Sequence, residues 1–329
     1  MKEKIIKALK QNTNKHISGE QLSELLGVSR TAVWKWINQL KAEGYVIESQ
    51  TKLGYRLVKS PETLFSYEIA PFMNTKLIGK YMMYFDTLDS TNNEAKRLAE
   101  MGFENGTVLI ADEQQAGRGR LGRNWVSPKG KGIWLTIMLK PQIAPKDASK
   151  MTIIAALAVL RAIGSICKAA PQIKWPNDIV LNGKKICGIL TEMNAEMDEI
   201  HYLIVGIGIN ANLDEADFDE TLLDKATSLK IENNNEVNRK ALIANILNEF
   251  ETLYMDFIKE ANIEKFFEEY RKVSATIGKQ VKIIDRKGET IGFAENLNIE
   301  GQLMVRKEDG TLIEVSSGEV SVRGIYGYV

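Results

Sequence analysis

The sequence predicts an α+β protein with a small helical head, a mixed central domain and a β-rich tail. Apolar residues recur at helical spacing near the N-terminus, and alternating residues follow them. The middle of the chain mixes helical with alternating patterns, whereas its end holds only short alternating segments between turn residues. At 329 residues the chain is longer than one ordinary domain. We therefore expect three domains, at residues 1–62, 75–275 and 276–329.

The head begins with three short predicted helices. Ser18 and Gln21 have the spacing of a capping box that opens the second helix, which Gly27 ends. Ser29 can cap the third helix in a similar way. The alternating residues 46–58, with turn residues near their middle, predict a small β-wing. Together these elements predict a winged helix-turn-helix.

The net charge of the chain is zero, but its distribution is uneven. Residues 1–60 carry 11 Lys and Arg against 5 Asp and Glu, and the remainder carries 32 against 38. This split favours a polyanion as the partner of the head, and we expect DNA to bind residues 18–43. A solvated basic face or a three-helix interaction module are the alternatives. The residues expected to contact DNA are Arg30, Thr31, Trp34, Lys35 and Asn38.

A connector at residues 61–74 leads into the body, where strand and helix patterns are mixed. The longest predicted helix spans residues 148–169, and two more span residues 239–258 and 263–274. Residues 278–329 hold short strands and turns that suit a small β-barrel. Strands in the body are expected at residues 81–86, 107–113, 133–139, 185–193 and 202–207.

Rare residue types exclude several classes of protein. Cys167 and Cys187 are the only cysteines, too few for a disulfide framework, so we expect a reducing, cytoplasmic setting. His16 and His201 are the only histidines, which argues against a histidine zinc cluster and a Ser/His/Asp triad. The longest apolar run, residues 151–160, is too short to span a bilayer, so we expect no membrane partner.

Glycine and arginine dominate residues 114–125, which read QQAGRGRLGRNW. The segment matches the pattern G-x-G-x-x-G, but a dinucleotide loop must open a helix, and Trp125, Pro128 and Gly130 follow instead. Backbone N–H groups and arginine side chains together favour a phosphate or carboxylate ligand. A flexible basic surface loop is the simpler alternative.

Three more motifs lie at the ends of predicted strands. In KWPND, residues 174–178, Asp178 can hold Mg²⁺ beside phosphates or merely cap a turn. Lys184 and Lys185 begin a strand whose alternation turns one lysine inward, although two exposed lysines are the ordinary alternative. GIGIN, residues 206–210, allows the backbone to pack closely over a ligand, or forms a plain bulge.

Residues 90–92, Ser-Thr-Asn, allow two interpretations. Thr91 and Glu94 have the spacing of a capping box, and taken alone this interpretation is favoured. Alternatively, the first turn of the helix presents hydroxyl and amide groups to a buried polar ring.

Five motifs occur in one order: STN at 90–92, QQAGRGRLGRNW at 114–125, KWPND at 174–178, KKICGILTEM at 184–193 and GIGIN at 206–210. In that order and spacing the chain resembles the bacterial biotin protein ligases. Its winged head resembles the subgroup that also represses biotin operons, so the likeness spans nearly the whole chain. The resemblance implies a seven-stranded ligase domain and an SH3-like C-terminal β-barrel.

The resemblance also assigns roles to individual residues. Those at catalytic positions are Lys185, Arg118 and Arg120. Those at biotin positions are Ser90, Thr91, Asn92, Gln114, Arg118, Gly119, Arg120 and Lys185. Those at ATP positions are Arg118, Arg120, Arg123, Lys174, Asn177, Lys185 and Asn210, with Asp178 as the metal ligand.

The implied reaction uses ATP and Mg²⁺ to activate biotin as biotinyl-5′-adenylate. A lysine of a biotin carboxyl carrier domain, such as that of acetyl-CoA carboxylase, then accepts the biotin. Positioning and charge stabilisation carry both steps without a protein nucleophile. We also expect the adenylate to act as co-repressor, because an ordered loop can complete the surface of a homodimer that binds operator DNA.

One stretch departs from the family pattern. Some relatives place a tryptophan over the adenine after GIGIN, whereas residues 224–229 read DKATSL here. Two other functions are considered: a ligand-sensing transcription factor without ligase activity, and a lipoate ligase. The first predicts a pocket without convergent phosphate-binding cations, and the second shares the expected body fold but not the GRGRxG loop.

Overall fold

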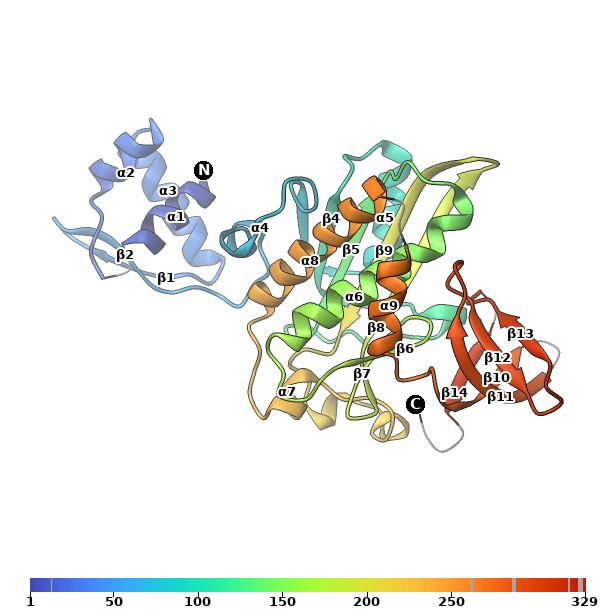
Figure 1. The fold of residues 1–329 in the computed structure, drawn as a ribbon. Coiled ribbons are helices and arrows are strands. Elements are labelled where there is room, and N and C mark those ends of the chain that lie inside the picture. Colours follow the sequence, from blue (N-terminus) through green and yellow to red (C-terminus); the bar gives the residue numbers. More distant parts are fainter. Residues whose placement is uncertain (13, 261–262, 286–287, 319, 325–327) are drawn as a thin grey trace. The chain divides into compact units, whose positions relative to one another are not determined.

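The computed structural model describes residues 1–12, 14–260, 263–285, 288–318, 320–324 and 328–329. The chain forms two compact units, Met1–Thr63 and Leu64–Val329, which are described separately here (Figure 1). Helices and mainly antiparallel sheets make up both units, which confirms the α+β class predicted from the sequence.

The first unit is the predicted winged helix-turn-helix. Its elements are α1 (Lys2–Gln11), α2 (Gly19–Leu26), α3 (Arg30–Ala42), β1 (Val46–Gln50) and β2 (Gly54–Lys59). Ser18 and Gln21 form the predicted capping box of α2, and Ser29 caps α3 by accepting a hydrogen bond from the Ala32 amide. Gly27 ends α2 with a φ of 65°, a conformation that favours glycine.

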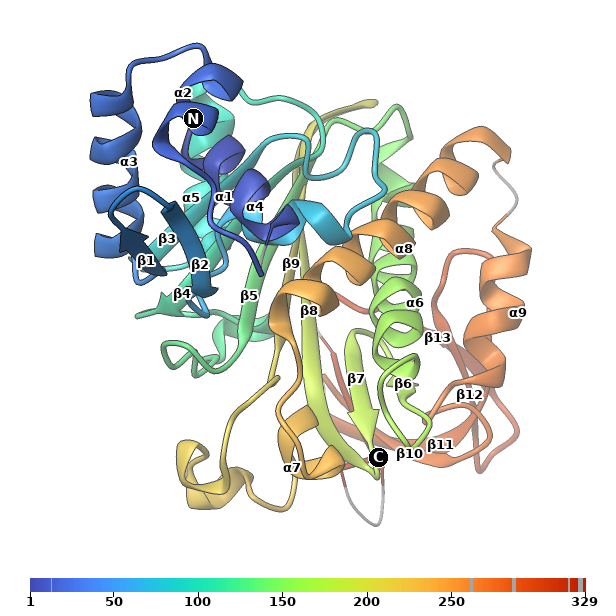
Figure 2. The ribbon, with the colours of Figure 1, turned by 90° about the vertical axis from the view of Figure 1, so that its left-hand side faces the viewer.

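A seven-stranded sheet forms the centre of the second unit, in the order β3-β4-β5-β9-β8-β7-β6 (Figure 2). β3 and β4 are parallel, and every other neighbouring pair is antiparallel. The strands are β3 (Met82–Leu88), β4 (Thr107–Gln114), β5 (Ile133–Leu139), β6 (Gln172–Lys174), β7 (Asp178–Leu181), β8 (Lys184–Glu196) and β9 (Glu199–Ile209). The five predicted strands are present, but β6 and β7 are too short to show a clear alternation in the sequence.

Helices cover both faces of this sheet. α6 (Lys150–Gly164) and α8 (Arg239–Glu260) pack together over one face, and α5 (Thr91–Met101) packs on the other. Alternate residues of β4 enter the two cores: Val108 and Ile110 face α6 and α8, whereas Leu109 packs with Ala95 of α5. The shorter helices are α4 (Ser66–Ile69), α7 (Leu229–Asn233), α9 (Glu264–Lys272), η1 (Ala70–Phe72), η2 (Arg120–Gly122), η3 (Pro145–Ser149), η4 (Glu215–Asp217) and η5 (Glu220–Leu222).

The predicted connector at residues 61–74 is wrong in its second half. Leu64 and Ile69 are fully buried in the core of the second unit, and α4 carries Glu68, which is buried and paired with Lys240 of α8 at 3.3 Å. The segment is short and interrupted by Pro71, so its sequence lacks the helical period that would have marked it as packed structure.

The C-terminal residues form a five-stranded antiparallel sheet in the order β13-β12-β11-β10-β14. Its strands are β10 (Gln280–Asp285), β11 (Gly288–Leu297), β12 (Leu303–Lys307), β13 (Leu312–Val315) and β14 (Ser321–Gly324). The Trp175 indole N–H donates to the Gly301 carbonyl at 3.1 Å, which ties this sheet to the end of β6. Across the described ranges, no helix is long and apolar enough to cross a membrane.

Candidate active site

A cavity of about 530 Å³ lies where the ends of several strands of the seven-stranded sheet meet. β4 and β9 end at this place and β5 and β8 begin there, so motifs far apart in the sequence meet. The C-terminal sheet contributes part of the wall. Every body residue predicted to form the site lines the cavity: Ser90, Thr91, Asn92, Gln114, Arg118, Gly119, Arg120, Arg123, Lys174, Asn177, Asp178, Lys185 and Asn210.

One end of the cavity is lined by polar groups that fix each other's orientation. Thr91 donates from its amide and its hydroxyl to Oε1 of Gln114, at 2.8 and 3.1 Å. Oδ1 of Asn92 accepts from the Thr136 hydroxyl at 2.7 Å, and its Nδ2 donates to Glu192 at 2.8 Å. These hydrogen bonds orient the side chains, so they can recognise a small polar ring.

The capping-box interpretation of residues 90–94 is therefore wrong. α5 begins at Thr91 with Ser90 as its N-cap, and no side chain caps this helix. Thr91 and Asn92 are buried at the edge of the sheet, where they bond to distant strands instead of to the first turn of their own helix. A buried polar group takes whichever partner the tertiary structure offers, and here that partner is not local.

Two paired glycines form the floor of the cavity beneath Trp125. Gly188 and Gly208 are paired on the neighbouring strands β8 and β9. A Cβ atom on Gly188 would lie 2.9 Å from the Trp125 ring, and one on Gly208 would lie 2.8 Å from its Nε1. Glycine is required at both positions because the indole packs directly on the backbone. Trp125 thus presents an aromatic surface inside the cavity, edge-to-face with Trp134 at a centroid distance of 6.4 Å.

The other end of the cavity holds an ion pair between Asp178 and Lys185, with an Oδ1 to Nζ distance of 2.6 Å. Lys185 is thus the inward lysine of the predicted pair, whereas Lys184 donates to the Leu223 carbonyl. The hydroxyl of Tyr328 donates to the second oxygen of Asp178 at 2.5 Å. Burial raises the pKa of Asp178, but Lys185 and Tyr328 outweigh burial and lower it below its ordinary value, so the carboxyl is ionised.

Further cations surround this carboxylate. Lys174 is buried, and its burial, reinforced by neighbouring cations, lowers its pKa to about 8. Burial also lowers the pKa of Arg120, whose guanidinium donates to Asn177 at 3.1 Å and to the Val320 carbonyl at 3.0 Å. Several buried or half-buried cations thus share one carboxylate, an electrostatic imbalance that favours binding of a polyphosphate.

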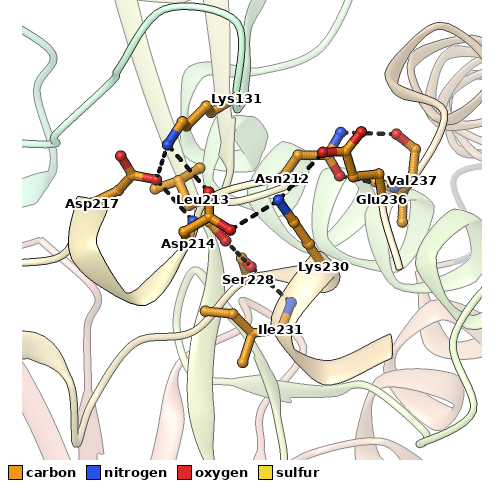
Figure 3. A network of polar contacts seen from close by, with 10 residues as sticks. All are labelled: Lys131, Asn212, Leu213, Asp214, Asp217, Ser228, Lys230, Ile231, Glu236 and Val237. Carbon is orange, nitrogen blue, oxygen red and sulfur yellow. Dashed lines mark hydrogen bonds and ion pairs between the residues drawn. The ribbon is translucent and has the colours of Figure 1, made fainter. Parts of the chain in front are cut away.

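Another wall of the cavity is the segment 211–237, which a polar network fixes to the sheet (Figure 3). Lys131 pairs with Asp217 at 2.5 Å and with Asp214 at 3.3 Å, and Lys230 pairs with Asp214 at 2.8 Å. The Asp214 amide also donates to Asp217 at 2.8 Å. The segment lines the cavity with Leu213, Asp217, Phe218, Asp219, Leu222, Asp224, Lys225 and Ala226.

Residues 224–229, where the family pattern suggested a tryptophan, lie beside the start of β8. The Lys185 amide donates to the Lys225 carbonyl at 2.8 Å, and the Thr227 amide donates to the Lys185 carbonyl at 3.0 Å. Asn210 holds the same stretch by donating from Nδ2 to the Thr227 carbonyl at 3.0 Å. The side chain of Asn210 therefore has a demonstrated packing role, and its predicted contact with ATP remains a prediction.

Trp125 and Tyr328 are among the cavity-lining residues to which sequence reasoning assigned no role. Trp125 belongs to a motif that drew attention for its arginines, and the two glycines that face it were the available signal. Tyr328 lies in no motif and meets Asp178 across 150 residues of sequence, so nothing local indicated it.

In the first unit, the five residues predicted to contact DNA all lie on the exposed side of α3. Val33, Ile37 and Leu40 are buried on its other side, as the helical period requires. Trp36 lies beside them and is half-buried. The exposed residues are Arg30, Thr31, Trp34, Lys35 and Asn38.

The fold and the cavity define a class of protein: an enzyme that binds a small polar ligand beside a phosphate-bearing one, joined to a winged helix-turn-helix. Cys187 lies close to the site, but burial raises the pKa of its thiol, so it supplies no thiolate. The described residues offer no cluster of three or more His, Cys, Asp or Glu side chains that could hold a metal ion.

Comparison with known proteins identifies the family. Residues 84–210 match the biotin/lipoate A/B protein ligase family, residues 2–56 an HTH domain, and residues 276–323 the biotin protein ligase C-terminal domain. The bifunctional ligase/repressor BirA of Bacillus subtilis is 39% identical over 94% of this chain and 95% of its own length. Its Escherichia coli counterpart is 27% identical over 93% of this chain and 92% of its own length.

The fold comparison agrees. The biotin protein ligase from Aquifex aeolicus, solved in complex with biotin and ATP, is 31% identical with a TM-score of 0.65, and the match covers 74% of this chain and 99% of that one. The chain therefore belongs to the biotin protein ligases of the bifunctional ligase/repressor type. This membership sets aside the transcription factor without ligase activity and the lipoate ligase.

Proposed function

We propose that the chain activates biotin with ATP and transfers it to a lysine of a biotin carboxyl carrier domain, and that biotinyl-5′-adenylate turns it into a repressor of biotin genes. The observation that carries the enzymatic half is the cavity, which places an ordered polar end beside a cationic end. The Aquifex relative holds biotin and ATP together, which supports the same pair of substrates here.

The polar end suits the biotin rings. Ser90, Thr91, Asn92 and Gln114 offer amide and hydroxyl groups whose orientation is already set. Arg118, Gly119, Arg120 and Lys185 line the same cavity and would contact biotin between its rings and the phosphates. Trp125 also lines the cavity, and its aromatic surface suits the apolar part of such a ligand.

The cationic end suits the phosphates of ATP. The biotin carboxylate attacks the α-phosphorus and pyrophosphate leaves, so two anions must approach each other, and Lys185, Arg118 and Arg120 oppose the charge that accumulates. Arg123, Lys174, Asn177 and Asn210 complete the proposed nucleotide site. In the second step the acceptor lysine attacks the acyl carbon, and AMP leaves with its electron pair.

Asp178 fits a role as Mg²⁺ ligand. It is an ionised carboxylate among phosphate-binding cations, and Mg²⁺ needs only one or two protein carboxylates because it keeps several waters. When bound, the ion would neutralise phosphate charge and thereby favour departure of pyrophosphate. Lys185, now paired with Asp178, would then be free to turn toward the phosphates.

The test of the ligase proposal is a labelling experiment. The protein is incubated with ATP, Mg²⁺, an apo carrier domain and either biotin or lipoate, and the mass of the carrier is measured. We expect a mass increase with biotin alone. Labelling by lipoate alone would contradict the proposal, and omission of Mg²⁺ tests the metal requirement separately.

The repressor half rests on the winged head. The exposed residues of α3, Arg30, Thr31, Trp34, Lys35 and Asn38, would meet operator DNA, and such heads usually bind two half-sites as a two-fold dimer. We propose that adenylate orders the 114–125 loop and so completes a homodimer surface, while carrier protein relieves repression by consuming adenylate. Sedimentation with and without adenylate, followed by operator titration, tests this, and unchanged mass and affinity would contradict it.

Three finer assignments accompany this function. Residues 1–62 would bind DNA, residues 75–275 would catalyse, and residues 276–329 would close the nucleotide end of the cavity. Cys167 and Cys187 are both free thiols, which agrees with work in a reducing cytoplasm.

A further inference from the structure

The C-terminal tail reaches the centre of the charged end of the cavity through one side chain. The hydroxyl of Tyr328 donates to Oδ2 of Asp178 at 2.5 Å, and the Lys174 ammonium lies 3.2 Å from the centroid of the Tyr328 ring. Tyr328 thus contacts a predicted metal ligand and a predicted ATP ligand at once. The match to the biotin protein ligase C-terminal domain ends at residue 323, before this tyrosine.

The two carboxylate oxygens of Asp178 have different partners. In the hydrogen bond between Tyr328 and Asp178, the hydroxyl is the donor and Oδ2 of the carboxylate is the acceptor. Oδ1 of the same carboxylate faces Lys185. The hydroxyl therefore occupies one carboxylate oxygen with a neutral donor and leaves the other to a charged partner.

We propose that Tyr328 is a positioning residue for the nucleotide and its metal ion: its hydroxyl orients the Asp178 carboxylate and its ring seats the Lys174 ammonium. This inference rests on the proposed function, because it needs Asp178 and Lys174 to meet Mg²⁺ and ATP. Carboxylates that bind metal ions are commonly held by a further hydrogen bond, and loss of such a partner typically weakens metal binding about 10- to 100-fold. The cation–π contact fixes Lys174 independently of that bond.

The opposite role, a plug that competes with nucleotide, makes the opposite prediction. If the tail had to leave before Mg²⁺ could bind Asp178, removal of the hydroxyl would strengthen binding of Mg²⁺ and ATP. The sign of the change therefore decides between the two roles.

The experiment compares Tyr328→Phe, which keeps the ring under Lys174, with Tyr328→Leu, which removes both contacts. Tyr84→Phe is the matched control, because the buried hydroxyl of Tyr84 has no hydrogen-bond partner among the residues that the structure describes. Calorimetry on the full chain measures the affinity for ATP with and without Mg²⁺, and the affinity for biotin. A Mg²⁺ titration of adenylate formation gives a second readout.

We expect Tyr328→Phe to weaken ATP binding about tenfold in Mg²⁺, with little change without Mg²⁺, and to raise the Mg²⁺ midpoint of adenylation. Tyr328→Leu should also weaken Mg²⁺-free ATP binding, because Lys174 loses its cation–π contact with the ring. Biotin affinity should stay at the wild-type value in all variants, which shows that they are folded. Unchanged or tighter binding of ATP and Mg²⁺ in Tyr328→Phe, or an equal loss of biotin affinity, would overturn the inference. Failure of the wild-type chain to bind ATP would instead overturn the proposed function.

Discussion

Two loops line the same cavity but are held in very different ways. The segment 211–237 is fixed by ion pairs from Lys131 and Lys230, and by the bonds of Asn210 and Asn212 to later parts of the segment. The loop at 115–125 is held without ion pairs among the described residues: its backbone bonds to itself and to Leu88 and Asp89, and Arg120 donates to Asn177 and Val320. Within the described part of the chain, Arg118 and Arg123 make no ion pair, and both are exposed.

The difference indicates which wall is preformed and which one a ligand must order. Segments with few buried contacts open at low free-energy cost, so the exposed part of this loop, Arg118 and residues 121–124, is the element that ligand binding can close. The segment 211–237 and the strand carrying Lys185 provide a fixed surface. On this view the fixed wall should control the rate of adenylate formation, and the loop should control how long the adenylate stays.

The largest expected effect belongs to the fixed wall. Lys185→Ala should remove about 3 to 4 kcal/mol of transition-state stabilisation, by analogy with loss of one oxyanion donor, and slow adenylate formation roughly a hundredfold or more. The mutation also removes the ion pair between Lys185 and Asp178. Single-turnover adenylation measures it, with Lys184→Ala as the matched control. An unchanged rate in Lys185→Ala would remove this lysine from the chemistry.

Arg118→Ala should act on the other wall and on a different step. Arg118 is exposed in the described structure and is expected to close over the adenylate, so its loss should speed adenylate release about tenfold, as for one charge-assisted hydrogen bond. Adenylate formation should slow less than in Lys185→Ala. A chase experiment with preformed adenylate measures release, and an unchanged release rate means that the loop does not retain the intermediate.

The same contrast explains what the sequence could predict. The capping-box pattern at Ser18 is confirmed, because that helix end is exposed and no tertiary partner competes for its side chains. The same pattern at Thr91 fails, because the edge of the sheet buries it beside Gln114. Local patterns are reliable where local contacts decide the structure, which is the case through most of the head.

The cavity shows what local sequence patterns could not predict. Motifs gave part of the cavity lining because they stand near the ends of strands, and strands of one sheet bring their ends together. No motif could show that Trp125 lies on Gly188 and Gly208, or that Tyr328 bonds to Asp178, because these contacts join residues that only the folded sheet brings together. The sequence therefore predicted residues that line one cavity, and the structure added how they are oriented.

A smaller effect is expected when the fixed wall is loosened. Lys131→Met removes the ion pairs to Asp217 and Asp214, and should raise KM for ATP about threefold with kcat nearly unchanged, since partly exposed ion pairs contribute little individually. Lys129→Met is the control, because Lys129 pairs with Asp86 at 2.6 Å outside the cavity. Steady-state kinetics at low and high salt measure both. Equal effects of the two variants would show that the network does not position the wall.

Substitutions in α3 should have no effect on ligation. Their rates are therefore the reference for the variants in both walls of the cavity. Arg30 and Lys35 are exposed on a separate unit and line no part of the cavity, so their replacement by alanine should leave adenylation and transfer at wild-type rates. Each substitution should weaken operator binding and reduce the slope of log K against log salt by about one, because one fewer phosphate is neutralised. The measurement is operator titration at several salt concentrations in the presence of adenylate.

If adenylate couples the two units, the coupling must be reciprocal, so operator DNA should slow adenylate release in the wild type and do so less in Arg30→Ala. Equal slowing in both proteins at matched DNA concentration would show that the head does not act through Arg30, whatever the loop does.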